Sequence, residues 1–230
     1  MTLLERYRNG DFQKVHNDIR LLGRDAFRPA NIDQVHPVLD ETFRRVRHNV
    51  ELVHRHLRDT GYRFLADSYD EGSKPFTPPH PDTEAQLAEL ARRVAPSHIP
   101  LSLQYFYRHI GSVDFSWDWE SVPEIPWTGA DPLVIAPLPV LLEELDLYSG
   151  DHELWIAPDD LVKDNVSGDA YYLSLYPYPV VDGNISGHNL PLVEYLRRTF
   201  ENGGFSRADE YDYPGLQELI DTIRPQLLPF

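Results

Sequence analysis

The chain has no cysteine among its 230 residues, so disulfides, thiol nucleophiles and thiolate metal sites are excluded. Long hydrophobic runs are also missing, because no uncharged apolar stretch approaches the ~20 residues of a membrane-spanning helix. The N-terminal segment MTLLERYRNGDFQKV is charged from Glu5 onward and lacks the apolar run of a signal peptide. We therefore expect a cytoplasmic protein that does not enter a membrane.

Three common active-site motifs are absent as well. The sequence has no G-x-S-x-G, no G-x-x-x-x-G-K-[ST] and no G-x-G-x-x-G. Its paired glycines, Gly203 and Gly204, follow a predicted helix, whereas a phosphate-binding loop precedes one. Serine-hydrolase and nucleotide-binding classes are therefore disfavoured, and we expect a protein that is not an enzyme.

Positive charge is scarce, since 21 Lys and Arg face 37 Asp and Glu, for a formal net charge of −16. Such a negative field disfavours nucleic acid or an anionic membrane as the main partner and suits a basic protein partner. Apolar residues are plentiful: they make up 41% of the chain, and aromatic residues make up 12%, which is ample for a packed core.

The acidity is unevenly distributed along the chain. Residues 1–66 carry 12 Lys and Arg against 9 Asp and Glu, whereas residues 67–230 carry 9 against 28. The change coincides with DSYDEGSKPFTPPHPD, residues 67–82, a composition typical of a loop or linker. We therefore predict an N-terminal helical extension (1–66), a linker (67–82) and a C-terminal domain (83–230), together forming one compact unit.

The N-terminal extension is predicted to be helical. Thr2 and Glu5 fit a capping box, and a second helix is predicted to end at Gly23. Its apolar stripe is Phe12, Val15, Ile19 and Leu22. A longer helix is predicted from Pro37 to near Gly61. Its burial face is Leu39, Phe43, Val46, Val50, Val53 and Leu57. We expect this face to dock on the C-terminal sheet.

The opposite side of the longer helix is basic. Its members are Arg44, Arg45, Arg47, His48, Arg55 and Arg58. Such a surface could bind phosphate, pair with the acidic half of the same molecule, or simply be solvated. Because the overall field is strongly negative, we favour intramolecular pairing or solvation.

Residues 99–115, IPLSLQYFYRHIGSVDF, combine a helix start, an amphipathic helix, a glycine stop and a strand. Pro100 suits the first helical turn, where its missing amide proton is not needed. The helical stripe is Leu103, Phe106, Tyr107 and Ile110. Gly111 follows the stripe, where a left-handed C-cap favours glycine. A helix that runs directly into a strand is therefore predicted.

The segment from Leu154 to Phe205 continues with a regular order of turns and elements. A short strand at Trp155 and Ile156 precedes an acidic turn, and a Ser167-Gly168-Asp169 turn precedes an aromatic strand over residues 171–176. Then come a hairpin-type turn at residues 182–184 and a helix over 192–200 that ends in glycines. Together with residues 99–115, this pattern resembles the SUKH superfamily and covers roughly half of the chain.

The resemblance implies an α+β fold and a function without catalysis. We expect an antiparallel or mixed sheet of about four to six strands flanked by helices, with the N-terminal extension packed on it. Bacterial members of the superfamily are usually immunity proteins that neutralise a toxin, often a nuclease. The alternative is a regulatory or scaffold protein without a toxin partner, as in the fungal regulators of cell-wall synthesis.

The remaining elements are predicted more coarsely. Thr83 and Gln86 suggest a capping box for a helix that ends before Pro96. A short strand is expected over residues 133–136 and a helix over 216–223, whereas residues 138–147 fit no single element.

Metal and acid–base sites have weaker support. The steps of six and two between His48, His54 and His56 scatter these side chains around a helix, so they do not suit a metal. Two acidic groups are also present: Asp114, Asp118 and Glu120, and Asp159, Asp160 and Asp164. Either group could hold a hard cation or supply acid and base, but turns and helix caps explain them equally simply. We expect no cofactor and no metal.

The predicted partner-binding surface combines tryptophans with carboxylates. Its members are Asp114, Trp117, Asp118, Trp119 and Glu120. Tryptophan is enriched at interface hot spots, and flanking carboxylates steer a basic partner such as a toxin domain. The alternative is that Trp117 and Trp119 pack this loop onto the core.

Overall fold

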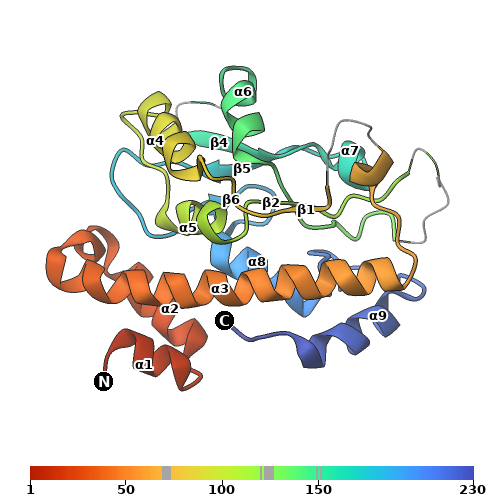
Figure 1. The fold of residues 1–230 in the computed structure, drawn as a ribbon, viewed down its shortest axis with the longest axis horizontal. Coiled ribbons are helices and arrows are strands. Elements are labelled where there is room, and N and C mark those ends of the chain that lie inside the picture. Colours follow the sequence, from red (N-terminus) through yellow and green to blue (C-terminus); the bar gives the residue numbers. More distant parts are fainter. Residues whose placement is uncertain (69–73, 120, 122–126, 149, 151) are drawn as a thin grey trace.

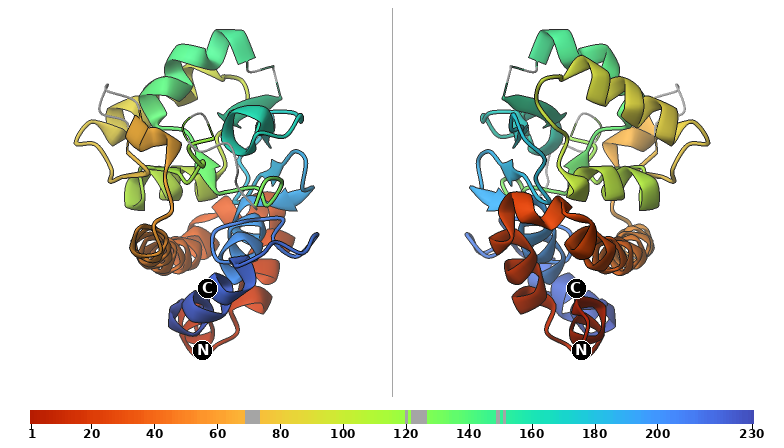
Figure 2. Two further views of the ribbon diagram at one scale, coloured as in Figure 1. Left: turned by 90° about the vertical axis from the view of Figure 1, so that its right-hand side faces the viewer. Right: turned by 90° about the vertical axis from the view of Figure 1, so that its left-hand side faces the viewer.

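The protein folds as the expected α+β structure (Figure 1). Its strands form two antiparallel sheets, of three and four strands, where a single sheet of about four to six strands was predicted. The structure is a computed structural model, and it describes all residues except 69–73, 120, 122–126, 149 and 151. Helices α1 (Leu3–Arg8), α2 (Phe12–Leu21) and α3 (Pro29–Asp59) open the chain. Both termini lie on one side of the molecule, and α4 (Thr83–Arg93) and α6 (Leu138–Tyr148) lie on the opposite side (Figure 2).

The predicted start of α1 is confirmed. The Glu5 amide donates to the Thr2 hydroxyl (3.2 Å), and the Glu5 carboxylate accepts from the Thr2 amide (2.7 Å), which completes the capping box. Helix α2 also follows the prediction, with Val15 and Ile19 fully buried and Gly23 in the left-handed region (φ +53°).

Helix α3 begins eight residues earlier than predicted, at Pro29 and not at Pro37. Arg28 is extended (φ −68°, ψ 143°), and Pro29 takes the first helical position, which tolerates a missing N–H. Pro37 lies inside the helix with its ring exposed, while Val35 and Val38 on the inner face are fully buried. Burial on both sides of Pro37 therefore outweighs the lost helical hydrogen bond.

The predicted burial face of α3 is confirmed, since all six of its apolar side chains are fully buried. The helix contacts α5 (Leu101–His109), α1 and α9 (Leu216–Ile223). It meets the β structure at β1 (Phe76–Thr77), so most of its docking surface is provided by other helices.

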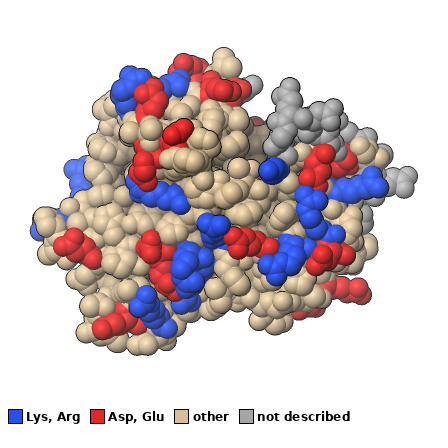
Figure 3. All heavy atoms as spheres, viewed as in Figure 1, with Lys and Arg blue, Asp and Glu red and all other residues tan. Residues whose placement is uncertain are grey.

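Four of the six basic side chains predicted on this side of α3 form ion pairs within the molecule, but three of them pair with carboxylates of α3 itself and not with the acidic half of the chain. Arg44 and Arg45 both bond to the Glu41 carboxylate at 2.8 Å. Arg47 pairs with Glu51 at 2.8 Å, and farther along the helix Arg58 pairs with Asp67 at 2.9 Å. Acidic and basic side chains consequently alternate over this face (Figure 3).

The first sheet has the order β1-β2-β3, with β2 (Ser112–Asp114) between β1 and β3 (Val134–Ile135). Its strand β1 lies in the segment predicted as a linker, where Phe76 pairs with Val113. The predicted helix-to-strand unit is confirmed: α5 ends at His109, Gly111 is left-handed (φ +92°), and β2 follows directly. Phe106 and Ile110 are fully buried.

The second sheet has the order β4-β5-β6-β7. Its strands are β4 (Glu153–Ala157), β5 (Tyr171–Ser174), β6 (Asn184–Ile185) and β7 (Leu190–Pro191). The Ala136 amide donates to the Ile156 carbonyl (2.8 Å), which ties this sheet to the end of β3. The tight hairpin turn joins β6 to β7 at residues 186–189, not at 182–184 as predicted, because Gly187 (φ +78°) and Asn189 (φ +53°) adopt the left-handed conformation there.

The remaining helices mostly follow the sequence. Helix α4 forms without the predicted capping box, since the Thr83 hydroxyl donates back to the His80 carbonyl (2.7 Å) and Asp82 is the N-cap. Helix α6 covers the segment left unassigned, and α7 (Asp160–Asp164) follows the acidic turn. Helix α8 (Leu192–Glu201) ends at the two left-handed glycines as expected.

The hydrophobic core is a single cluster of buried side chains that extends from Tyr7 to Phe230. It includes side chains from both sheets and from the N-terminal helices. Within the part of the chain that the structure describes, no helix combines the length and apolar character needed to cross a bilayer.

Candidate functional site

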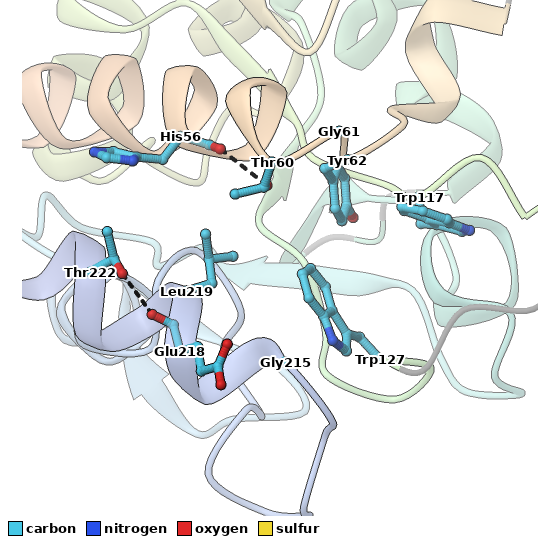
Figure 4. Close-up of a pocket in the computed structure, with 10 residues that line it drawn as sticks. All are labelled: His56, Thr60, Gly61, Tyr62, Trp117, Trp127, Gly215, Glu218, Leu219 and Thr222. Carbon is cyan, nitrogen blue, oxygen red and sulfur yellow. Dashed lines mark hydrogen bonds between the residues drawn. The ribbon is translucent and has the colours of Figure 1, made fainter.

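A cavity of about 450 Å³ opens between the end of α3 and the start of α9. We call it the aromatic groove (Figure 4). Its lining residues are His56, Thr60, Gly61, Tyr62, Trp117, Trp127, Gly215, Glu218, Leu219 and Thr222. Tyr62 and the two tryptophans form one end of the groove, and side chains of α3 and α9 face each other at the other end (Figure 4).

Tyr62 anchors the aromatic end because the chain turns sharply just before it. Gly61 stops α3 in the left-handed conformation (φ +81°), and the Tyr62 hydroxyl donates to the Phe115 carbonyl (2.7 Å). Its ring lies edge-on to Trp117 (4.9 Å between centroids) and stacks with Trp127 (5.8 Å). Burial raises the pKa of Tyr62 well above its ordinary value, so the phenol stays neutral.

Trp127 is fixed by its polar edge and leaves ring surface to the groove. Its indole N–H donates to the Pro214 carbonyl at 2.8 Å. The ring also meets Phe205 in a T-shaped contact at 5.6 Å, and the residue remains half-buried. The indole N–H is thus already hydrogen-bonded within the protein, and only aromatic ring surface of Trp127 faces the groove.

The charge of the groove is negative. Glu218 on α9 is exposed and supplies a carboxylate, whereas no lysine or arginine is among the described residues that line the cavity. His56 lies on the α3 side of the groove, and its Nε2 lies 3.2 Å from the side-chain amide of Gln226.

Of the four sequence-predicted contact residues that the structure describes, Trp117 alone lines the groove. Asp118 is 4% exposed, and its Oδ1 accepts from the Ser121 amide (3.1 Å), so the carboxylate caps a turn. The Trp119 indole N–H donates to the Val162 carbonyl (2.8 Å) and pins the loop to α7.

Asp114 does not line the groove. The Asp114 carboxylate accepts from the Ser116 amide at 3.0 Å. Glu120 lies outside the described residues. Sequence reasoning missed Tyr62, Trp127 and Glu218, of which only Trp127 had a signal, its place in the aromatic-rich segment 116–129.

A second concentration of polar side chains is buried beneath β5 and α7, and we call it the Asp131 cluster. Six of its members are at most 6% exposed as whole residues: Asp131, Asp160, Lys163, Asp164, Tyr171 and Ser206. The seventh is His188, whose side chain is 2% exposed. The sequence suggested Asp160 and Asp164 but gave no signal for the others, which come from segments far apart in the chain.

Asp131 is the centre of this cluster. Its carboxylate pairs with Lys163 and accepts hydrogen bonds from the Ser206 hydroxyl and from the Tyr171 hydroxyl, the latter at 2.8 Å. His188 Nε2 lies 3.1 Å from the same carboxylate. The Lys163 ammonium also lies 3.8 Å from the centroid of the Tyr171 ring.

The electrostatics of the cluster shift the pKa values of neighbouring carboxyl groups in opposite directions. Burial alone would raise the pKa of Asp131, but the Lys163 ammonium and the hydrogen bonds from His188 and Ser206 hold it well below its ordinary value. Burial raises the pKa of Asp164 to about 7, although its Oδ2 accepts the Asp131 amide proton at 2.9 Å. Burial also raises the pKa of Asp160, against the opposing effect of Lys163.

The Asp131 cluster does not have the geometry of a serine nucleophile relay. Such a relay needs one imidazole nitrogen on the hydroxyl and the other on the carboxylate. Here the Ser206 hydroxyl (3.3 Å) and the Asp131 carboxylate (3.1 Å) both face Nε2 of His188. Ser206 is fully buried, so no substrate reaches its hydroxyl.

Outside the cluster lies a cleft of about 350 Å³ between α7 and the turns that flank β5. Asp160 forms part of its wall, and a side chain at Gly168 would come within 2.5 Å of the Asp160 carboxylate. Arg207 lies 3.6 Å from the same carboxylate. On the side of the cleft, the Asp160 carboxylate is therefore covered by the backbone at Gly168 and lies close to the Arg207 guanidinium.

The candidate metal ligands are not brought together. Asp159 caps α7 by accepting from the Leu161 amide (2.6 Å), while Asp160 and Asp164 face Lys163 and the Asp131 amide. His54 Nε2 accepts from Arg58 at 3.1 Å. Across the residues that the structure describes, no three histidine or acidic side chains are grouped so that they could hold a metal ion.

We compared the chain with models of protein families, with curated proteins and with solved structures, and none of the three comparisons gives a match. The function therefore has to be argued from the aromatic groove, the charge and the pattern of the sequence.

Proposed function

We propose that this chain is a non-enzymatic protein-binding module whose contact surface is the aromatic groove. The observation that carries the proposal is the aromatic wall of the groove, in which the half-buried Trp117 and Trp127 lie against the buried ring of Tyr62. Tryptophan and tyrosine dominate the energetics of protein interfaces because they bury much area with little loss of side-chain entropy. The groove is about 450 Å³, which suits one or two side chains of a partner.

The partner that fits best is a basic protein. A net charge of −16 accelerates association with a basic partner and suppresses binding to acidic ones. The SUKH-like order of residues 99–115 and 154–205 supports the more specific proposal of an immunity protein. In that role the chain binds a toxin domain and covers the surface with which the toxin acts.

The absence of catalysis is part of the same proposal. The Asp131 cluster is buried, and its central carboxylate is paired with the Lys163 ammonium and hydrogen-bonded by the Tyr171 hydroxyl. Buried groups that are already paired stabilise a fold, whereas catalytic groups must reach a substrate.

The experiment uses the proteins encoded beside this gene. Each is expressed alone and together with this chain, and growth is measured. We expect one neighbour to stop growth alone and to be tolerated when the chain is present, with a purified complex of both proteins. If no neighbour is toxic, and a wall-synthesis or signalling protein binds instead, the immunity proposal is wrong and the scaffold alternative holds.

The groove is tested with a matched pair of substitutions on α9. Thr222 lines the groove and Gln217 does not, although both are exposed. Thr222→Arg places a long side chain across the groove, and Gln217→Arg makes the same charge change elsewhere. We expect Thr222→Arg to abolish complex formation and protection while Gln217→Arg retains both. Equal behaviour of the two variants would place the interface elsewhere.

A further inference from the structure

We infer that the aromatic groove receives a lysine or arginine side chain of the partner, with Glu218 as its counter-ion. This inference rests on the proposed function, because it names the chemistry that the same groove recognises. It is carried by two features that meet in one cavity, aromatic ring surface and a carboxylate without a lining cation.

The aromatic side chains are oriented for a cation. Because the Trp127 N–H is used by Pro214 and the Tyr62 hydroxyl by Phe115, neither polar group is left for a ligand. What remains accessible is ring surface, whose negative electrostatic potential attracts guanidinium and ammonium groups. The Tyr62 ring centroid lies 4.9 Å from that of Trp117 and 5.8 Å from that of Trp127, so the rings form one aromatic wall against which a cation can lie.

Glu218 supplies the opposite charge from the facing helix. It lines the groove and is exposed, and no lysine or arginine among the described lining residues neutralises it. Asp221, one turn further along α9, differs because Arg224 lies 3.7 Å from its carboxylate. Glu218 is thus the groove carboxylate that an incoming cation would meet.

A purely apolar occupant fits less well. Covering the groove with a hydrocarbon side chain would remove water from the Glu218 carboxylate without replacing its hydrogen bonds, which is unfavourable. An arginine side chain instead places its methylene stem against Leu219 and the rings, and its guanidinium near the carboxylate. The overall charge of −16 favours approach of such a partner.

The test uses two short probes that differ only in charge. Ac-Gly-Arg-Gly-NH₂ and its citrulline counterpart are titrated into the full chain, and the indole N–H signals of Trp117 and Trp127 are followed by NMR. We expect saturable shifts with the arginine probe, at millimolar affinity, and at least about fivefold weaker binding of the neutral citrulline probe.

Substitutions on α9 identify the counter-ion. Glu218→Gln should weaken the arginine probe about fivefold and leave the citrulline probe unchanged, whereas Asp221→Asn should change neither. Equal affinity of the two probes, an unchanged arginine affinity in Glu218→Gln, or the absence of indole shifts would each overturn the inference.

The inference and the proposed function can fail separately. A cognate partner that is lost with Thr222→Arg but binds Glu218→Gln with unchanged affinity would keep the groove as the interface and refute the cation. Charge-selective binding of the arginine probe with no partner interaction at the groove would keep the cation inference and refute the groove as the partner interface.

Discussion

At the scale of single residues, Asp131 is the most constrained side chain described. It has a left-handed backbone (φ +60°), which is rare for a residue other than glycine, and its carboxylate accepts bonds from residues of three later segments. Lys163, its ion-pair partner, is fully buried. Removing the Asp131 charge would therefore leave the buried Lys163 ammonium without its close partner, facing the Asp160 carboxylate at the longer distance of 3.7 Å.

Asp131→Asn tests this dependence, because asparagine retains the shape and tolerates the left-handed conformation. We expect a loss of about 3–5 kcal/mol in the free energy of unfolding, measured by urea denaturation. The control is Asp209→Asn, which removes the exposed pair with Arg198 (3.2 Å) and should cost less than about 1 kcal/mol. Similar losses in both variants would show that the buried pair has no special weight.

Asp164 makes stability depend on pH. Its pKa is about 7 in the folded chain, against an ordinary value of 3.8 in the unfolded chain. Between these values the unfolded chain binds fewer protons than the folded one, so this carboxyl lowers stability progressively as pH rises from about 4 to 7. Above pH 7 the destabilisation is complete and constant.

Asp164→Asn should therefore be nearly neutral near pH 4.5 and stabilising by on the order of 2–4 kcal/mol at pH 8, because the amide oxygen still accepts the Asp131 N–H. Urea denaturation of both proteins between pH 4.5 and 8.5 measures the difference. A difference that does not change with pH would contradict the raised pKa.

At the scale of elements, the joint between α5 and β2 depends on one glycine. Gly111 is left-handed (φ +92°), and a Cβ there would lie 2.2 Å from the Thr77 carbonyl oxygen. The close approach is what allows β1 to pair with β2 beside the helix end. Both conformation and space therefore require glycine at this position.

Gly111→Ala should lower the free energy of unfolding by about 2–4 kcal/mol, because it adds a backbone clash to the strain of a left-handed alanine. Gly10→Ala is the control, since Gly10 has a similar angle (φ +101°) with open space around its Cβ position. It should cost only about 1 kcal/mol. Thermal unfolding of the two variants measures this, and equal costs would mean that the packing around Gly111 adjusts.

At the scale of the whole molecule, the net charge of −16 arises from residues 67–230, which carry 9 Lys and Arg against 28 Asp and Glu, and it acts over long range. Surface ion pairs along α3 neutralise that helix locally, as the alternating colours of Figure 3 show. The remaining acidic field should therefore govern how fast a basic partner arrives and contribute less to how long it stays.

We expect the association rate constant with a cognate partner to fall at least about tenfold between 50 and 500 mM NaCl, with the dissociation rate constant changing much less. Surface plasmon resonance measures both constants. An association rate independent of salt would show that the acidic field does not steer the partner.

Local chemistry made much of the fold predictable. The capping box of Thr2, the apolar stripe of α3 and the left-handed glycines 111, 203 and 204 act within a turn or two of helix, so their signals lie in adjacent residues. The start of α3 was misjudged because long-range burial of Val35 and Val38 keeps Pro37 inside the helix.

Neither the aromatic groove nor the Asp131 cluster could be predicted from the sequence as a complete set of residues. Trp117 was predicted as a contact residue, but Tyr62, which follows α3, and Glu218, which lies on α9, line the same groove from distant positions in the chain. Asp118 was expected on the same surface and is buried, because a turn needs its carboxylate. Composition and periodicity decided class, charge and helices by themselves. Only the tertiary structure decided which side chains meet, since contacts between distant segments depend on how the elements pack and leave no local pattern.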